Sequence, residues 1–316
     1  MLRLLFASAQ PAQFLHRIEI PISMSALYFR VTFTNIAGQT ATLREIGRLR
    51  FSIRQQPVVD ADADYLSALA NHWYGSNEFI STVALPFRWS CFIPRSFVGD
   101  SNVERVTKSD AAIFDTSFTS TLLGKVTAGT FLAELYAVSG EGPQSYNLLL
   151  FQQAYPTVAA NSNFVDDLSS VENVCAAYIS DVVTGVLTLA GSAIDRVRAR
   201  KGDVTVDASR TALMAYTATK YNIEGAGDAS TTQILGELFG MEGSDFSARL
   251  EDRYNLTVQT GATTATPQML TVGMKPNPDR LGESTAEIQD RLSRAKRDKA
   301  ASGKTRALSV IDATTG

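Results

Sequence analysis

The sequence has very few of the residues from which most enzyme active sites are built. Two of its 316 residues are histidines and two are cysteines. His16 falls in an alternating, strand-like run and His72 beside an apolar, helix-like face, so we expect a structural role for both. The sequence also lacks a P-loop, a dinucleotide-binding glycine motif, a zinc-protease motif, a paired C-x-x-C and a G-x-S-x-G. Carboxylate pairs of the glycosidase type need no local spacing, but no sequence feature points to one. These absences predict that the protein is not an enzyme.

Cofactor and metal sites are equally poorly represented. Cys91 and Cys175 are far apart, share no metal-type spacing and have apolar neighbours, which predicts buried free thiols. Asp60, Asp62 and Asp64 alternate as in a calcium loop, but the glycine and the later bidentate glutamate of an EF-hand are missing. The start of a helix, where the helix dipole favours anions, is the preferred interpretation of these aspartates. We predict no metal and no cofactor.

Strong charge and long apolar runs are also missing. Charged residues make up 19% of the chain and the net charge is −3, which argues against general nucleic-acid binding. No stretch of the sequence approaches the roughly 20 apolar residues of a membrane span. The apolar run in Met1–Ala9 is shorter than the usual signal-peptide core of roughly 7–15 residues, so we expect residues 1–13 to form a short packing arm.

The most informative feature that is present is a stretch that occurs twice. The sequence I-G-R-L-R at 46–50 is followed by V-D-A at 59–61, and I-D-R-V-R at 194–198 is followed by V-D-A at 206–208, at offsets of 148 and 147 residues. A repeat of this length is a whole domain, not a solenoid turn. Its charged residues are Arg48, Arg50, Asp60, Arg196, Arg198 and Asp207. They allow two interpretations, a duplicated ionic site or a duplicated structural element, and the structural role is the preferred one.

Hydrophobic periodicity indicates strands in most of the chain and a helix after each repeated block. Residues 26–34 alternate as a half-buried strand does, and residues 43–53 are expected to do the same with a bulge at Gly47. A helix is predicted over 60–74, and another, polar on more sides, over 207–221. A further helical turn is expected over 232–241.

An aromatic, proline-punctuated segment extends over residues 79–98. We expect short strands of a packed sheet there, and a sugar-stacking platform is the alternative. The glycine-rich stretch Ser139–Pro143 is typical of a linker and falls near the boundary that the repeat predicts, which we place between Ser139 and Asn163.

The C-terminal segment has a different character. Ser284–Glu287 fits a capping box, and apolar residues then follow at helical spacing. Between Glu287 and Arg306 the net charge is +4. Its basic residues are Arg291, Arg294, Lys296, Arg297, Lys299, Lys304 and Arg306. Two interpretations stay open, a solvated helix or a basic arm that contacts nucleic acid, anionic lipid or an acidic neighbour.

Two successive β-rich units of about 150 residues, each with a strand that leads into a helix, resemble the double jelly-roll major capsid proteins of icosahedral, often membrane-containing bacteriophages and related viruses. The resemblance implies a mainly β fold of two tandem antiparallel β-sandwich or jelly-roll domains, with short helices in the connections and a C-terminal helical tail. The expected organisation is an N-terminal arm at 1–13, a first jelly roll at 14–142, a second at 143–278 and a basic tail at 279–316.

The same resemblance implies a structural virion protein that is made in the host cytoplasm. Homotrimers would form pseudo-hexagonal capsomers of an icosahedral shell, in contact with neighbouring capsomers and with other virion proteins such as a penton protein. The basic tail would meet an internal lipid membrane or the viral genome. The alternative is a two-domain β-sandwich protein for carbohydrate binding or adhesion, with Trp73, Trp89 or Phe92 stacking on sugars.

Overall fold

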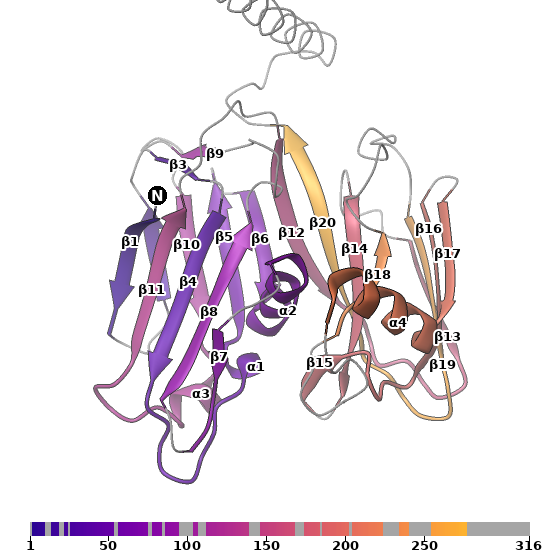
Figure 1. The fold of residues 1–316 in the computed structure, drawn as a ribbon, viewed down its shortest axis with the longest axis horizontal. Coiled ribbons are helices and arrows are strands. Elements are labelled where there is room, and N and C mark those ends of the chain that lie inside the picture. Colours follow the sequence, from indigo (N-terminus) through magenta and orange to yellow (C-terminus); the bar gives the residue numbers. More distant parts are fainter. Residues whose placement is uncertain are drawn as a thin grey trace, which may run out of the picture. The chain divides into compact units, whose positions relative to one another are not determined.

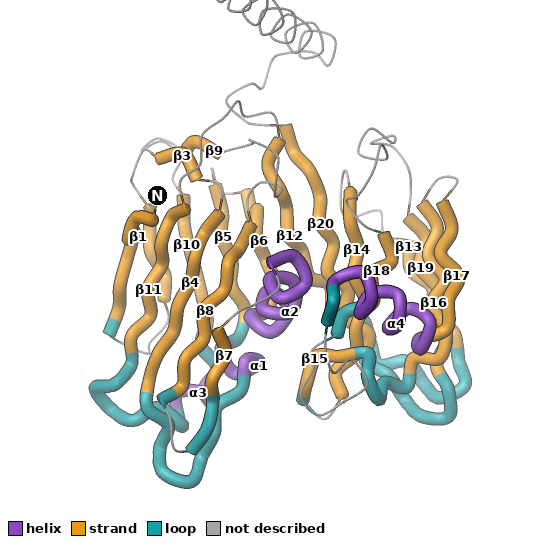
Figure 2. The backbone as a smooth tube through the Cα atoms, in the orientation of Figure 1, coloured by secondary structure: helices purple, strands orange, loops and turns teal. Residues whose placement is uncertain are grey.

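The computed structural model describes residues 2–9, 14–18, 22–24, 26–53, 56–74, 78–83, 86–94, 104–106, 112–138, 146–167, 174–183, 185–201, 204–223, 234–239 and 254–276. Within these residues β-strands predominate, with short helices between them (Figure 1, Figure 2). The described residues up to Lys275 belong to one compact unit. The predicted tail helix, with its basic residues, lies outside the described residues.

The elements fall into two series along the chain. The first series contains β1 (Leu2–Ser8), β2 (Phe14–Ile18), β3 (Ile22–Met24), β4 (Ala26–Phe33), α1 (Leu43–Ile46), β5 (Arg48–Ile53), β6 (Gln56–Asp62), α2 (Ala63–Tyr74), β7 (Glu78–Ile80), β8 (Phe87–Pro94), β9 (Glu104–Val106), β10 (Ala112–Ser117), α3 (Ser120–Leu123) and β11 (Leu132–Val138). The second contains β12 (Tyr146–Ala154), β13 (Asn163–Asp167), β14 (Val174–Val183), β15 (Val186–Thr188), β16 (Ile194–Lys201), β17 (Val204–Ser209), α4 (Arg210–Tyr221), β18 (Gly236–Phe239), β19 (Tyr254–Thr260) and β20 (Pro267–Pro276).

The two series build the same pair of sheets. In the first series one sheet has the order β1-β11-β4-β8-β7, and the other contains β2-β10-β5-β6. In the second series the matching orders are β12-β20-β14, with β18 and β15 also paired to β14, and β13-β19-β16-β17. When the strands of the two series are matched in chain order, the four corresponding strands of each sheet have corresponding neighbours in the two jelly rolls. Two antiparallel layers with four matching strands each form a jelly roll, so the chain contains two. The predicted fold class is confirmed for the two jelly rolls and the short helices in their connections.

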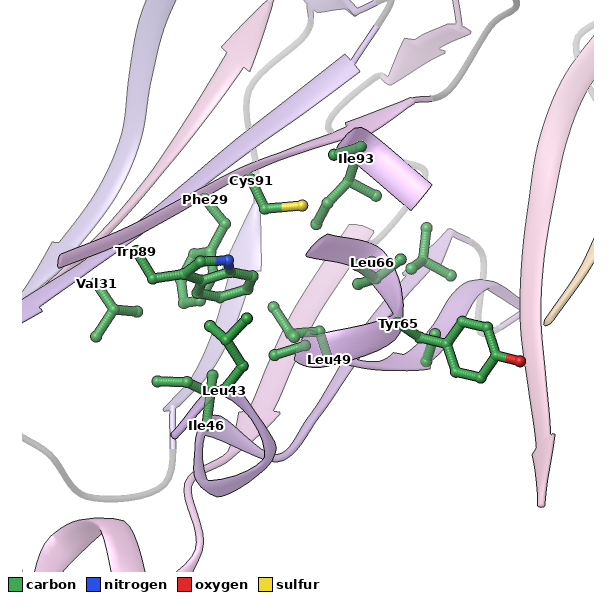
Figure 3. Packing of buried hydrophobic residues seen from close by; sticks show 14 of the residues in the cluster. Phe29, Val31, Leu43, Ile46, Leu49, Tyr65, Leu66, Trp89, Cys91 and Ile93 are labelled. Atoms are coloured by element: carbon green, nitrogen blue, oxygen red, sulfur yellow. The ribbon is translucent and has the colours of Figure 1, made fainter. Parts of the chain in front are cut away.

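Each jelly roll has its own apolar core. Alternation in β4 turns Leu27, Phe29 and Val31 inward, where all three are fully buried. Figure 3 shows this first cluster, in which the side chains of both sheets meet helices α1 and α2. The smaller second cluster is built around Val197 and Leu256 in the same way.

The helices that follow the repeated blocks correspond closely. Both α2 and α4 are 12 residues long, and α4 begins 147 residues after α2. The prediction of their start was wrong by about three residues, because Asp60 and Asp207 belong to strands β6 and β17. Each aspartate lies opposite an arginine of the neighbouring strand, and this cross-strand pairing favours the extended backbone there.

Three further expectations need correction. Residues 43–46 form a helical turn instead of a strand, because the Glu45 carboxylate accepts a hydrogen bond from the Thr42 amide at 2.8 Å and caps that turn. Within the range 232–241, where a helical turn was expected, Gly236–Phe239 are strand β18, since their backbone pairs with β14. Residues Leu2–Ser8 of the expected arm are strand β1, which pairs with β11 and so belongs to the first jelly roll.

Candidate functional site

The two jelly rolls meet where strand β6 of the first pairs with strand β12 of the second. This pair is parallel, with Leu150 opposite Val59 and Phe151 opposite Asp60. It joins one sheet of each jelly roll into a single nine-stranded sheet. We call this region, together with helix α2 and the strands that α2 contacts, the junction.

Helix α2 makes buried polar contacts with the second jelly roll. The Tyr65 side chain points away from the other labelled residues of the first core (Figure 3) and is fully buried. Its hydroxyl donates to the Gln268 carbonyl oxygen at 2.7 Å and accepts from the Ser180 hydroxyl at 3.2 Å. The Trp73 indole N–H donates to the Tyr178 hydroxyl at 2.8 Å. These contacts hold α2 against β14 and β20, because separating them would leave a buried hydroxyl without a partner, at a cost in stability of roughly 1–3 kcal/mol.

A second group of polar side chains lies next to Tyr178. The His72 ring is packed edge-on against Tyr178 and Tyr221, with centroids 6.3 and 5.2 Å apart. Burial lowers the pKa of His72 to about 4, so the ring is neutral at pH 7. Tyr221 donates a hydrogen bond to the Glu237 carboxylate, which also forms a 2.6 Å ion pair with Lys220. Tyr221, Lys220 and Glu237 are paired with one another, which suits a structural role.

The charged residues of the repeat form the same ionic cluster twice. Asp60 of β6 forms ion pairs with Arg48 (2.5 Å) and Arg50 (3.1 Å). At the second site Asp207 forms ion pairs with Arg196 (2.6 Å) and Arg198 (2.8 Å). Hydrogen bonds from its two arginines lower its pKa to about 2. Each carboxylate is neutralised by guanidinium groups, so the cluster braces a hairpin and presents no free base.

The two clusters differ in what lies beside them. Arg48 reaches across the junction and its terminal nitrogen donates to the Gln152 carbonyl oxygen of β12 at 3.1 Å. The matching residue, Arg196, has a side chain that is 54% exposed. The side chain of Arg48 is itself 40% exposed, so the first cluster is partly covered by the junction and the second is more open to solvent.

The three alternating aspartates do not form a calcium loop. Besides the clamped Asp60, Asp62 lies 3.8 Å from Arg48, and Asp64 pairs with Arg44 at 3.3 Å. Burial raises the pKa of Asp64 to about 6. Within the described parts of the chain, no group of three or more histidine, cysteine, aspartate or glutamate side chains is arranged to hold a metal ion.

The other residues singled out in the sequence have ordinary structural positions. Trp89, one of the three aromatic residues considered for sugar stacking, is fully buried between the sheets of the first core, whereas Phe92 of the same segment is 38% exposed. Cys91 is a buried free thiol whose pKa is raised by burial, as expected. His16 lies on β2, paired with Phe114 of β10. None of the helices in the described ranges is long and apolar enough to cross a membrane.

Sequence reasoning missed most of the junction. Tyr65, Tyr178, Gln152 and Gln268 are separated by up to 203 residues, and their types carry no motif. The one available signal was the helix that follows the first repeated block, whose face has more aromatic residues than that of its second copy.

Comparisons with known proteins identify the fold. No protein-family model matches the sequence, and no curated protein matches it by sequence. Among solved structures, the STIV major capsid protein superposes with a TM-score of 0.61 and 10% identity, covering 90% of this chain and 97% of that one. The major capsid protein P2 of bacteriophage PM2 gives 0.55 and 9%, over 89% and 98% of the chains. PBCV-1 VP54, fitted into a reconstruction of the virophage Sputnik, gives 0.52 and 8%, over 87% and 92%. This chain therefore has the double jelly-roll fold of these proteins.

Proposed function

We propose that this chain is a major capsid protein whose homotrimers are the capsomers of an icosahedral shell. The observation that carries the proposal is the duplication itself. Two jelly rolls of identical strand order are joined in one compact unit. A threefold axis acting on two similar domains yields a ring of six, and rings with a hexagonal outline tile a surface. The fold shared with three proteins of virus particles supports the same conclusion.

The chemistry of the chain supports an architectural role over catalysis. Lys220 and Glu237 form an ion pair, and the ionic clusters of the repeat are self-neutralised. Interactions of this kind hold two domains together and do not turn over a substrate. The carbohydrate-binding alternative gains no support from Trp89, which is buried in the first core.

In this function the chain acts in the virion, having been made in the host cytoplasm, and its partners are other copies of itself, neighbouring capsomers and other virion proteins such as a penton protein. The end of the first jelly roll at residue 142, the second jelly roll at 143–278 and the tail at 279–316 are part of the proposal. The tail carries the seven basic residues named above, so it is proposed to contact an internal membrane or the genome.

Assembly is the direct test of the function. The purified full-length chain is expected to elute with a mass three times its 34.2 kDa in light scattering. Negative-stain microscopy should show particles with threefold symmetry and a hexagonal outline. A chain that stays monomeric at every concentration, and forms no larger assembly, would contradict the proposal.

The tail requires its own experiment. The full-length chain and a variant with all seven basic tail residues changed to glutamine are mixed with anionic vesicles and, separately, with double-stranded DNA. Binding to one of them by the parent chain, lost in the variant and weakened by salt, supports a contact with that partner. Equal behaviour of the two chains with both partners would refute it.

A further inference from the structure

The junction inside one chain provides a template for the contact between two chains. We propose that helix α4 and strand β17 of one copy dock on the outer face and the β1 edge of the β1-β11-β4-β8 sheet of the next copy, and so repeat the junction between the two jelly rolls. This inference deepens the proposed function and rests on it, since it names the surfaces that close the trimer. Four features of the chain support it.

The first feature is the pattern of burial on the two matched helices. In α2, Tyr65 and His72 contact the second jelly roll, and Ala68 and Leu69 fall on the same helical face; all four are at least 97% buried. The residues of α4 that lie 147 positions later are Ala212, Ala215, Tyr216 and Thr219, and all four are exposed. Tyr216 is 54% exposed. The face that α2 buries against a jelly roll is therefore open on α4.

The second feature is the sheet on which α2 rests. Tyr178 of β14 and Leu270 of β20 lie opposite each other, and both are buried as members of the first core cluster. Each belongs to the outer face of its own jelly roll, because Ile179 and Met269, their neighbours in sequence, face the second core instead. An outer face of the second jelly roll is thus covered by the first.

The third feature is the matching outer face of the first jelly roll. The paired residues Leu4, Tyr136, Tyr28 and Phe92 form one row across β1, β11, β4 and β8. The rings of this row are in contact, with Tyr28 centred 5.0 Å from Phe92 and 5.9 Å from Tyr136. Leu4 is 48% exposed and Phe92 is 38% exposed. This aromatic and aliphatic row occupies the strands that correspond to the covered sheet, and a helix face of small residues with one tyrosine is a suitable partner for it.

The fourth feature is the pair of sheet edges. At the junction β6 pairs in parallel with β12. Their counterparts are β17 and β1, and among the described strands each of these stands at the end of its sheet. Arg48 donates to the backbone of β12 at the junction, while Arg196, at the same place on the second hairpin, is held by Asp207 with more than half of its side chain exposed. Pairing of β17 with β1 of the next copy would bring Arg196 to a backbone carbonyl, as Arg48 is now.

The chemistry of the two surfaces favours a second copy of this chain over any other partner. Both halves of the contact are on every copy, and they are different surfaces, so the contact is head-to-tail. The intrachain junction already shows a helix and an edge strand of this fold bound to such a sheet and edge. A ring of six alternating jelly rolls leaves neither surface open.

Photo-cross-linking of the full-length chain tests the contact. Benzoylphenylalanine is placed at position 216, the labelled copies are mixed and reassembled with isotope-labelled unmodified copies, and the linked peptides are sequenced. The expected links join α4 of one copy to β1, β4, β8 or β11 of another. The matched control carries the same group at Val165, which is 68% exposed on β13, at the opposite end of the sheet from β17, and should give no links to these strands.

Two variants measure the strength of the contact. Tyr216→Asp and Arg196→Ala alter exposed side chains and are expected to weaken trimer formation at least tenfold in dilution experiments, while Val165→Asp leaves it unchanged. Trimers whose links fall elsewhere, or which persist unweakened in Tyr216→Asp, would overturn this inference and leave the proposed function standing. A strictly monomeric parent chain would remove the proposed function, and this inference with it.

Discussion

Burial shifts the pKa values of two groups on helix α2 in opposite directions, and we predict that their effects on the free energy of unfolding nearly cancel between pH 6 and 4. Burial raises the pKa of Asp64 from 3.8 to about 6, so the folded chain takes up this proton before the unfolded chain does. The free energy of unfolding therefore rises as the pH falls from 6 to 4. Burial lowers the pKa of His72 from 6.5 to about 4, so the unfolded chain binds that proton first. Its contribution to stability is complete above pH 6.5 and is lost as the pH falls toward 4.

The two contributions have similar size. One pKa unit corresponds to about 1.4 kcal/mol, so each shift of two to two and a half units corresponds to about 3 kcal/mol over the same pH range. The parent chain should therefore show little change in this part of its stability between pH 6 and 4. In the Asp64→Asn variant only the contribution of His72 remains, so the free energy of unfolding of this variant should fall by about 3 kcal/mol as the pH is lowered from 6 to 4. In the His72→Gln variant only the contribution of Asp64 remains, so the free energy of unfolding should rise by a similar amount.

Urea unfolding followed by tryptophan fluorescence measures this directly, since Trp73 lies at the junction and Trp89 in the first core. The comparison uses the dependence of unfolding free energy on pH, so a constant loss of stability in either variant does not affect it. Variants whose pH dependence equals that of the parent chain would refute the reasoning. A change of the same sign in both variants would refute it as well.

The remaining predictions concern packing and reactivity. Tyr65→Phe removes a hydroxyl that is bonded across the junction and should lower the free energy of unfolding by about 1–3 kcal/mol in urea titrations, and no change would contradict the role of this hydroxyl. Gly236→Ala should cost about 1–3 kcal/mol in the same assay, because the added methyl carbon would lie 2.5 Å from side-chain atoms of Leu189 and of Leu213 on α4; a neutral result would show that these leucines can yield. Cys91 should resist alkylation in the folded chain and react after unfolding, as peptide mass mapping would show, because its thiol is buried and its pKa raised.

The duplicated fold could be predicted because it depends on local patterns. Alternation in residues 26–34 specified a half-buried strand, and the repeated I-x-R-[LV]-R and V-D-A blocks marked matching hairpins. The boundaries of α2 and α4 were less accurate because an aspartate is favourable both at a helix start and opposite an arginine in a hairpin. Only the pairing with the neighbouring strand decides between these two.

The junction could not be predicted because its contacts depend on tertiary structure. The pairing of β6 with β12 gives no periodic signal, and Tyr65 looks like any other helix residue until β14 and β20 are placed beside it. The weak amphipathicity expected of residues 207–221 was a correct observation whose meaning was missed. Helix α2 is apolar on two sides because two jelly rolls cover it, whereas in the single chain α4 packs mainly through Leu213 and Thr217.

The parallel pairing of β6 with β12 also bears on the size of the assembly. A head-to-tail contact has no built-in end, and copies added with the wrong rotation grow into an open filament. If each jelly roll is rotated by about 60° relative to the one before it, three copies close into a ring and no further copy can be added. The few residues that fix the angle of this one strand pair would therefore decide between a closed particle subunit and a fibre.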